Sequence, residues 1–182
     1  MPKIIKNLNE EILKYAKDIL INLGYNKLTM RGLAEKSNVA LGTLYNYFPT
    51  KSDLIIKLME SYWYDYLEVI DEIDKEEQDF FTKLKKIYEK LETFVQIFLE
   101  VWVRNTRCEY THKDVESKRV FLEKFNKKME DILIKANSEH KIVLFMDSYQ
   151  ISKFIVQNFF TMAQMKEFEY ADFEQIIKKM FS

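Results

Sequence analysis

Residues that form tight turns are scarce in this chain: its 182 residues include three glycines and two prolines. A β-sheet protein needs a turn after every short strand, and most such turns use glycine or proline. A helical protein of the same length needs far fewer turns. Hydrophobic residues nevertheless make up 47% of the chain, which supplies enough apolar side chains for a folded core. The sequence therefore predicts an all-α protein.

Apolar residues at helical spacing, together with capping residues, predict where the helices lie. Gly24 ends the first helix, Thr29 caps the second, and Thr50 with Asp53 forms a capping box for a long helix. Asp147 marks a break or a cap within a later apolar stretch, and Asp172 is expected to cap the last helix. The predicted helices cover residues 8–23, 30–36, 40–48, 51–74, 80–105, 114–136, 142–166 and 172–181.

The predicted helices fall into two groups. The first three are short, and the last two of them are separated by a tight turn at residues 37–38, which is the pattern of a helix-turn-helix. We therefore expect a helix-turn-helix domain over residues 1–50. A long helix joins it to a second domain over residues 51–182, which is a bundle of about five helices.

The segment 38–54, NVALGTLYNYFPTKSDL, places large polar side chains beside an apolar helix face. On a helix over residues 40–48, the apolar face consists of Leu44 and Phe48. Gly42 keeps the opposite surface flat, so another backbone can approach it closely. Thr43 and Asn46 are short enough to hydrogen-bond base edges in a DNA major groove.

The other exposed residues of this region suit the phosphate backbone of DNA. Tyr45 and Tyr47 place hydroxyl groups at the ends of rigid rings, where they can reach flanking phosphates. Lys51 lies in the first turn of the next helix, and its ammonium together with the free N–H groups of that turn forms a phosphate anchor. Thr29 and Arg31 open the preceding helix and are expected to clamp the backbone from the other side.

The distribution of charge agrees with an anionic partner for this part of the chain. Residues 1–57 carry nine Lys and Arg against five Asp and Glu, whereas the remainder carries 19 against 24. A basic segment on an otherwise acidic chain favours a polyanion such as DNA as the partner of that segment.

The stretch 24–54, GYNKLTMRGLAEKSNVALGTLYNYFPTKSDL, resembles the DNA-binding domain of TetR-family transcriptional regulators. The resemblance covers about residues 8–57. It implies a sequence-specific, ligand-responsive repressor that binds a pseudo-palindromic operator in double-stranded DNA as a homodimer. The positions that it implies as DNA contacts are Thr29, Gly42, Thr43, Tyr45, Asn46, Tyr47 and Lys51.

Two positions depart from the family's pattern. Family members commonly have Ser or Thr at the position of Ala40, where it caps the recognition helix, and often have Lys at the position of Leu41. Loss of the cap costs about 1 kcal/mol of local helix stability. Leu41 either touches a thymine methyl group or packs within the protein. The departures leave open an alternative function, that of a helical interaction or sensor protein with weakened DNA binding.

The resemblance also implies that the second domain binds an effector and forms the dimer. One short recognition helix buries too little surface for tight binding, so two copies are expected to read half-sites about 34 Å apart. In the family the last two helices usually form the dimer interface. The apolar residues that they offer here are Ile151, Phe154, Ile155, Phe173, Ile176, Ile177 and Met180.

An effector pocket in the second domain would be lined by aromatic residues. The chain is 15% aromatic and contains eight methionines, which favours a roomy, adaptable interior and a small apolar or aromatic effector. Aromatic side chains at helical spacing also form ordinary cores, so each of them has a purely structural interpretation. The candidates are Tyr66, Phe94, Phe98, Trp102, Phe121, Phe125 and Phe159.

The sequence gives little indication of catalysis. It contains no Gly-rich phosphate loop, no Ser-His-Asp set and a single cysteine, so we do not expect an enzyme or a cofactor. Cys108, His112 and Glu116 would share one face of a continuous helix, as in a metal site or a thiol sensor. We expect no metal site there, and a redox response of Cys108 stays an open alternative.

No feature of the sequence indicates export or a membrane. The longest uninterrupted apolar run, residues 142–146, is far shorter than the roughly 20 residues that span a bilayer. No apolar stretch of signal-peptide length follows the N-terminus. A lone cysteine excludes an internal disulfide and is typical of a reducing compartment. We therefore expect a cytoplasmic protein without a membrane partner.

Overall fold

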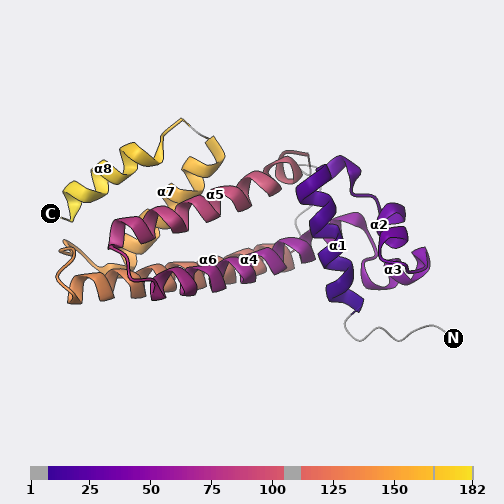
Figure 1. Ribbon diagram of the computed structural model, residues 1–182, viewed down its shortest axis with the longest axis horizontal. Coiled ribbons are helices and arrows are strands. Elements are labelled where there is room, and N and C mark those ends of the chain that lie inside the picture. The colour runs from indigo at the N-terminus through magenta and orange to yellow at the C-terminus, as the bar shows by residue number, and fades with distance from the viewer. Residues whose placement is uncertain (1–7, 105–111, 166, 182) are drawn as a thin grey trace. The chain divides into compact units, whose positions relative to one another are not determined.

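The computed structural model describes residues 8–104, 112–165 and 167–181, with the side chains of residues 99–104 and 112–115 left out of the description. Its regular elements are all helical, which confirms the predicted fold class. None of the described helices is long and apolar enough to cross a membrane. The elements are α1 (Leu8–Leu23), the 3₁₀ turn η1 (Tyr25–Lys27), α2 (Met30–Lys36), α3 (Leu41–Tyr47), α4 (Lys51–Lys75), α5 (Phe80–Arg104), α6 (His112–Ser138), α7 (Ser148–Met165) and α8 (Tyr170–Met180) (Figure 1).

The chain packs as two compact units. The first unit contains the chain up to Tyr62 together with the end of α5 from Glu100. The second contains Trp63–Leu99 and the helices from α6 onward. The division falls inside α4, which is one uninterrupted helix of 25 residues and contributes its first turns to one unit and the rest to the other.

The first unit is held together by one apolar core. Helix α1 packs against α2 and η1, and α2 packs against α3 (Figure 1). Helix α1 buries Ile12 and Ala16 completely, and α3 contributes Leu44, which is also fully buried. Phe48, directly after α3, is 1% exposed. This core is the reason that three short helices, each marginal by itself, are stable together.

The turn between α2 and α3 is closed by an asparagine in the left-handed conformation. Asn38 has φ of 53°, and its N–H donates to the Glu35 carbonyl at 3.1 Å. The next N–H, that of Val39, donates back to the Ala34 carbonyl at 3.0 Å. These two bonds satisfy carbonyl groups at the end of α2 and form a Schellman motif, for which asparagine is a tolerated substitute for glycine.

Several predicted helix ends are confirmed by their hydrogen bonds. The Thr29 hydroxyl accepts from the Gly32 N–H at 3.1 Å at the start of α2. Thr50 and Asp53 form the predicted capping box, in which the Thr50 N–H donates to the Asp53 carboxylate at 2.9 Å and the Asp53 N–H donates to the Thr50 hydroxyl at 3.1 Å. Gly24 ends α1 with φ of 81°, where a side chain would be strained.

Other predicted ends differ from the structure. Asp147 caps α7, which is one of the two roles predicted for it, by accepting from the Gln150 N–H at 3.0 Å. Helix α7 therefore begins at Ser148, and residues 142–147 precede it rather than form part of the predicted helix over 142–166. Asp172 lies in the first turn of α8 and does not cap it, since the cap position belongs to Glu169. The prediction favoured Asp172 because an acidic side chain is equally favourable in the first turn of a helix.

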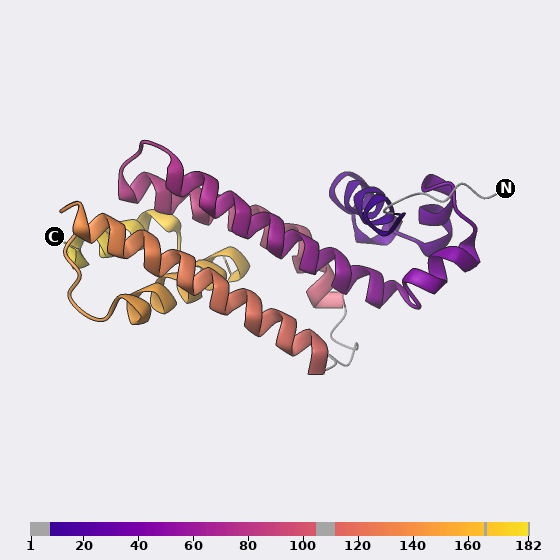
Figure 2. The same cartoon turned by 90° about the horizontal axis from the view of Figure 1, so that it is seen from below.

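Helices α4 and α6 run alongside one another in the second unit (Figure 2). Aromatic rings join them: Trp63 stacks on Phe121 with centroids 5.1 Å apart, and Tyr66 meets Phe125 edge-on at 5.2 Å. At the C-terminal end of α4, Lys83 donates to the Asp74 carbonyl at 2.5 Å. A lysine there stabilises the last carbonyl groups of the helix, which carry its partial negative charge.

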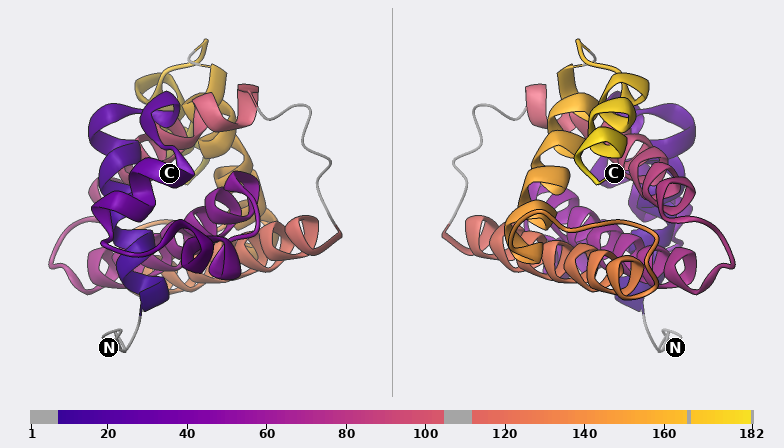
Figure 3. Two further views of the ribbon diagram at one scale, coloured as in Figure 1. Left: turned by 90° about the vertical axis from the view of Figure 1, so that its right-hand side faces the viewer. Right: turned by 90° about the vertical axis from the view of Figure 1, so that its left-hand side faces the viewer.

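Helices α5, α7 and α8 complete the second unit (Figure 3). The Gln96 side chain of α5 donates to the Ala163 carbonyl of α7 at 2.8 Å. Phe159 of α7 packs edge-on against Phe173 of α8 with centroids 5.6 Å apart, and both rings are almost fully buried. The two last helices therefore share a core within a single chain.

We predict that two substitutions at Asn38 change the free energy of unfolding differently, because the residue lies in the left-handed conformation. Asn38→Ala should lower the free energy of unfolding by about 1 kcal/mol, because an alanine in this conformation is strained. Asn38→Gly should leave it unchanged or raise it slightly. Urea unfolding followed by circular dichroism measures both values. Equal loss of stability in the two variants would show that the Asn38 side chain, rather than its backbone conformation, matters.

Candidate nucleic-acid interface

Helix α3 presents one buried face and one exposed face. Leu44 has no exposed surface, whereas Tyr45 is 44% exposed and Tyr47 is 48% exposed. Asn46 is exposed as well, and Thr43 is half-buried. A large aromatic side chain that lies on the surface leaves apolar area in water. The exposed face of α3 is therefore suited to a partner that covers it.

Gly42 lies on this face and is not required by the packing of the chain itself. A Cβ atom built at Gly42 meets no heavy atom within 4 Å. Gly32 in α2 is different, because a Cβ atom there would lie 3.0 Å from the Thr29 hydroxyl oxygen that caps the helix. A glycine in a helix costs stability relative to alanine, so Gly42 carries a cost that the described fold does not explain. A glycine without such a packing role is typical of a surface that another backbone approaches closely.

The start of α2 holds two more of the predicted contacts. Thr29 and Arg31 are both exposed. Because the Thr29 hydroxyl accepts from the Gly32 N–H, its own hydrogen can be donated to another acceptor.

Lys51 makes contacts within the first unit that the sequence did not indicate. Its ammonium donates to the Tyr25 carbonyl at 3.1 Å and lies 3.6 Å from the centroid of the Tyr25 ring. Partial burial lowers the pKa of this ammonium. These contacts tie the first turn of α4 to η1, so Lys51 supports the fold in addition to any contact with a phosphate.

Ala40 leaves the recognition helix without a side-chain cap, whereas both alternatives for Leu41 stay open. Ala40 occupies the cap position of α3 with an extended backbone and makes no side-chain capping bond. Leu41 begins the helix and is half-buried, so it neither belongs wholly to the core nor lies fully on the surface.

The predicted dimer residues divide into two sets. Four of them have side chains buried in the second unit of the same chain, where a second chain cannot reach them: Ile151, Ile155, Phe173 and Ile177. Phe154 on α7 and Ile176 on α8 are 42% and 47% exposed, and Met180 is half-buried. The helical spacing identified both faces of these helices as apolar but could not tell which one the chain itself covers.

The predicted pocket aromatics lie in packed ring clusters. Tyr66, Phe121 and Phe125 pack on one another, and the Tyr66 hydroxyl donates to the Ile87 carbonyl at 3.0 Å. Burial raises the pKa of Tyr66. Phe94 and Phe98 form a second pair with centroids 5.1 Å apart, and the side chain of Trp102 lies outside the described part of the chain.

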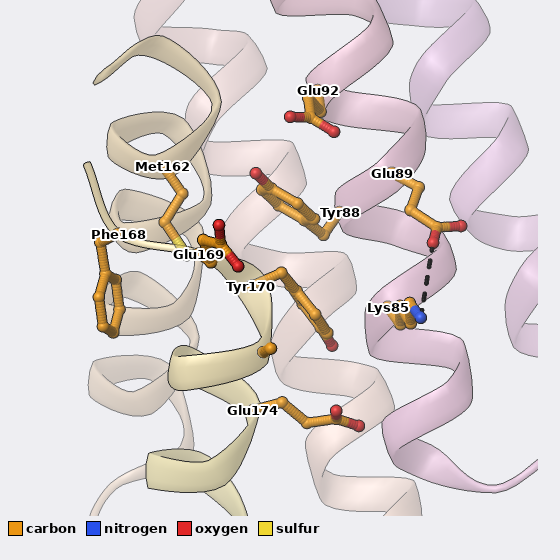
Figure 4. Close-up of a pocket in the computed structure, with 10 residues that line it drawn as sticks. Lys85, Tyr88, Glu89, Glu92, Met162, Phe168, Glu169, Tyr170 and Glu174 are labelled. Atoms are coloured by element: carbon orange, nitrogen blue, oxygen red, sulfur yellow. Dashed lines mark ion pairs between the residues drawn. The ribbon is translucent and has the colours of Figure 1, made fainter. Parts of the chain in front are cut away.

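A hollow of about 520 Å³ lies elsewhere in the second unit, between α5, the end of α7 and the start of α8 (Figure 4). Phe159, one of the predicted aromatics, contacts two tyrosines that line the hollow, Tyr88 and Tyr170. Sequence reasoning missed those tyrosines. The available signal was the spacing of Lys85, Tyr88, Glu89 and Glu92, which places them on one face of α5.

The alternative metal or thiol site at Cys108, His112 and Glu116 is not tested, because the side chains of its first two members lie outside the described residues. Within the described part of the chain, no group of three His, Cys, Asp or Glu side chains is placed to hold a metal ion.

Comparison with known proteins identifies the first unit. Residues 12–58 match the family model of bacterial regulatory proteins of the tetR family. An HTH-type transcriptional regulator of Haemophilus influenzae is 27% identical over 90 residues, which are 50% of this chain and 48% of that protein. The HTH-type transcriptional repressor KstR of Mycolicibacterium smegmatis is 47% identical over 36 residues, which are 20% of this chain and 18% of that protein. The matches thus span about half the length of the first relative and less than a fifth of the second.

The fold extends further than the sequence similarity. The crystal structure of the Bacillus subtilis transcriptional regulator FadR in complex with stearoyl-CoA superposes with a TM-score of 0.64 at 17% identity, over 94% of this chain and 96% of that one. This likeness shows a shared fold in both units. The similarity to the tetR family of bacterial regulatory proteins is thus shown for residues 12–58, which contain the helix-turn-helix.

Proposed function

We propose that this protein is a sequence-specific transcriptional repressor of the cytoplasm that binds its operator as a homodimer and releases it in response to a small molecule. Residues 1–50 form the DNA-binding domain in this proposal, and residues 51–182 bind the effector and form the dimer. Each part of the proposal has its own support.

The observation that carries DNA binding is the exposed face of α3. Buried Leu44 and Phe48 fix the helix, and the residues on the opposite side make no contribution to the core. Asn46 and Thr43 supply donors and acceptors for base edges, and the Tyr45 and Tyr47 hydroxyls supply donors for phosphates. Uncovered Gly42 lets the helix lie close to the DNA.

The assignment as a ligand-responsive repressor draws on relatives. KstR is named as a transcriptional repressor, and FadR was crystallised with stearoyl-CoA. In this chain α4 runs without a break from Lys51 to Lys75 and belongs to both units. A ligand that binds one position of α4 more tightly than another would therefore also shift the DNA-binding unit toward the favoured state. The size of this shift is set by the difference in the ligand's affinity for the two states.

The homodimer is supported by apolar surface on the last two helices. Phe154 and Ile176 are exposed on α7 and α8, although neither contributes to the core of its own chain. Exposed large apolar side chains are common singly but are also typical of interfaces. Binding to a pseudo-palindromic operator requires two copies, since each contributes one recognition helix.

The alternative is a helical interaction protein with weakened DNA binding. Ala40 leaves α3 without a side-chain cap, and the Lys51 ammonium is engaged by Tyr25. Both features weaken the interface without removing it. The exposed face of α3 favours the repressor, because an interaction protein has no need of Gly42, Tyr45 and Asn46 together on one short helix.

We predict that the protein binds its own upstream DNA selectively and that the affinity depends on the exposed face of α3. Tyr45→Phe should weaken binding about fivefold by removing one hydroxyl contact to phosphate. Asn46→Ala should weaken it more and reduce discrimination between operator and random DNA. Fluorescence anisotropy across a salt series measures both effects. Because Lys51 also supports the fold, Lys51→Ala is not a clean test.

Tyr64→Phe is the matched control for these variants, since Tyr64 is 54% exposed on α4 in the second unit. It should bind as the unsubstituted protein does. Equal affinity for upstream and random DNA, with no loss in Tyr45→Phe or Asn46→Ala, would contradict the repressor and favour the interaction protein.

We predict opposite effects of Gly42→Ala on folding and on DNA binding. Alanine should raise the free energy of unfolding by up to about 1 kcal/mol, because the added methyl group meets nothing in the protein and alanine is the better helix former. DNA affinity should fall about tenfold or more, because the methyl group enters a closely packed interface. Thermal unfolding and anisotropy together measure the pair. A more stable variant with unchanged affinity would show that α3 does not approach DNA at Gly42.

We predict that Phe154→Glu together with Ile176→Glu gives a folded monomer. A charge at both positions opposes burial against a second chain. Sedimentation velocity measures the change in mass, and circular dichroism checks the fold. Ile134→Glu is the control, because Ile134 is equally exposed, at 46%, but lies on α6. A double variant that dimerises as well as the unsubstituted protein would place the interface elsewhere.

A further inference from the structure

The hollow between α5, the end of α7 and the start of α8 has the size of a small-molecule site. Its volume of about 520 Å³ lies within the roughly 300–1,000 Å³ of typical ligand pockets. All of its lining residues belong to the second unit. The apolar part of the lining consists of Tyr88, Met162, Phe168, Tyr170 and Ala171 (Figure 4).

Two tyrosines give the hollow an aromatic wall. The rings of Tyr88 and Tyr170 stack with centroids 4.9 Å apart and planes 22° apart. The ring of Phe159 packs against both tyrosines, with its centroid 5.3 Å from that of Tyr88 and 6.2 Å from that of Tyr170. Among the described residues, the buried Tyr170 hydroxyl oxygen has no hydrogen-bond partner, although buried hydroxyls normally have one.

The charged part of the lining is strongly acidic. Four carboxylates surround the tyrosines, Glu89 and Glu92 from α5 and Glu169 and Glu174 from the start of α8. Two lysines pair with them: Lys85, which lines the hollow, lies 3.9 Å from the Glu89 carboxylate, and Lys178 of α8 lies 3.0 Å from the Glu174 carboxylate. Ion pairs of this kind are weak where they are open to solvent, so they neutralise the site only in part.

The negative charge of these carboxylates contributes to the raised pKa values of the two tyrosines. Burial, followed by the charge of Glu174 and Glu89, raises the pKa of Tyr170. Burial and the neighbouring Glu92 raise the pKa of Tyr88. Both phenols therefore keep their protons at neutral pH.

We propose that this hollow binds an organic cation that has a flat aromatic body and a single positive charge. The aromatic body packs against Tyr88 and Tyr170, which line the hollow, and the charge is attracted by the four carboxylates. An anion such as an acyl-CoA is disfavoured by the same carboxylates. The inference names the effector class for the proposed repressor and rests on that function only for its link to DNA release, since binding itself can be measured without DNA.

Three probes of nearly equal size and shape test the charge preference. They are N-methylquinolinium as the cation, 1-methylnaphthalene as the neutral ring and 1-naphthoate as the anion. Isothermal titration calorimetry with the full-length protein should show the cation binding at least tenfold more tightly than the neutral ring, and the anion most weakly. The preference should shrink as salt is added, because exposed carboxylates are screened. Equal affinity for cation and neutral ring would overturn the proposal.

Substitutions locate the binding site. Glu169→Gln and Glu174→Gln should each weaken binding of N-methylquinolinium about three- to tenfold and leave 1-methylnaphthalene unaffected. Glu68→Gln is the matched control, because Glu68 is an exposed carboxylate on α4 that does not line the hollow. It should have no effect. A loss of the same size in Glu68→Gln would show that only the net charge of the protein matters, and the site would be refuted.

Anisotropy on the upstream DNA separates this inference from the proposed function. Selective cation binding without selective DNA binding would leave the site standing and refute the repressor. Selective DNA binding by a protein that shows no preference for the cation would leave the repressor standing and refute the site. If the cation site and the repressor function both hold, N-methylquinolinium should weaken DNA binding by the unsubstituted protein. The same concentration should weaken DNA binding by Glu169→Gln to a smaller extent.

Discussion

The burial of Leu44 and Phe48 is the contact on which the DNA-binding unit depends. Leu44 has no exposed surface and Phe48 has 1%, so these two side chains fix the rotation of α3 about its own axis. The left-handed turn at Asn38 fixes where α3 begins. Because a helix has only one rotation for a given buried face, the positions of Gly42, Tyr45 and Asn46 on the surface follow from the core. The packing of the core thus determines which residues lie on the proposed interface, and those residues do not need to stabilise the fold.

The two units use charge in opposite ways. The exposed face of α3 is neutral and polar, while basic residues are enriched in the surrounding chain, as expected for a partner that is a polyanion. The hollow of the second unit combines carboxylates with tyrosine rings, as expected for a small cation. A ligand with the charge sign of DNA is therefore poorly suited to that hollow, and the two proposed partners do not compete for the same kind of surface.

The sequence predicted the helices and the helix-turn-helix because these depend on local signals. Caps at Thr29 and Thr50, the stop at Gly24 and the spacing of apolar residues all act within a few residues. The pocket residues depend on contacts between distant segments, and helical spacing cannot tell whether an aromatic ring meets another ring or a cavity. For the same reason it could not separate buried Ile155 from exposed Phe154, or reveal that the Lys51 ammonium lies on Tyr25.

The open space around Gly42 has a consequence for how such a regulator diversifies. A Cβ atom at Gly42 meets no atom within 4 Å, and Tyr45 and Asn46 are exposed, so replacement of these residues leaves the core and its stability largely intact. In the proposed repressor, mutations at these positions can therefore change which operator is recognised while the protein stays folded. A duplicated gene with this architecture can acquire new targets by changes at these few positions, and an engineer can retarget the protein by the same route.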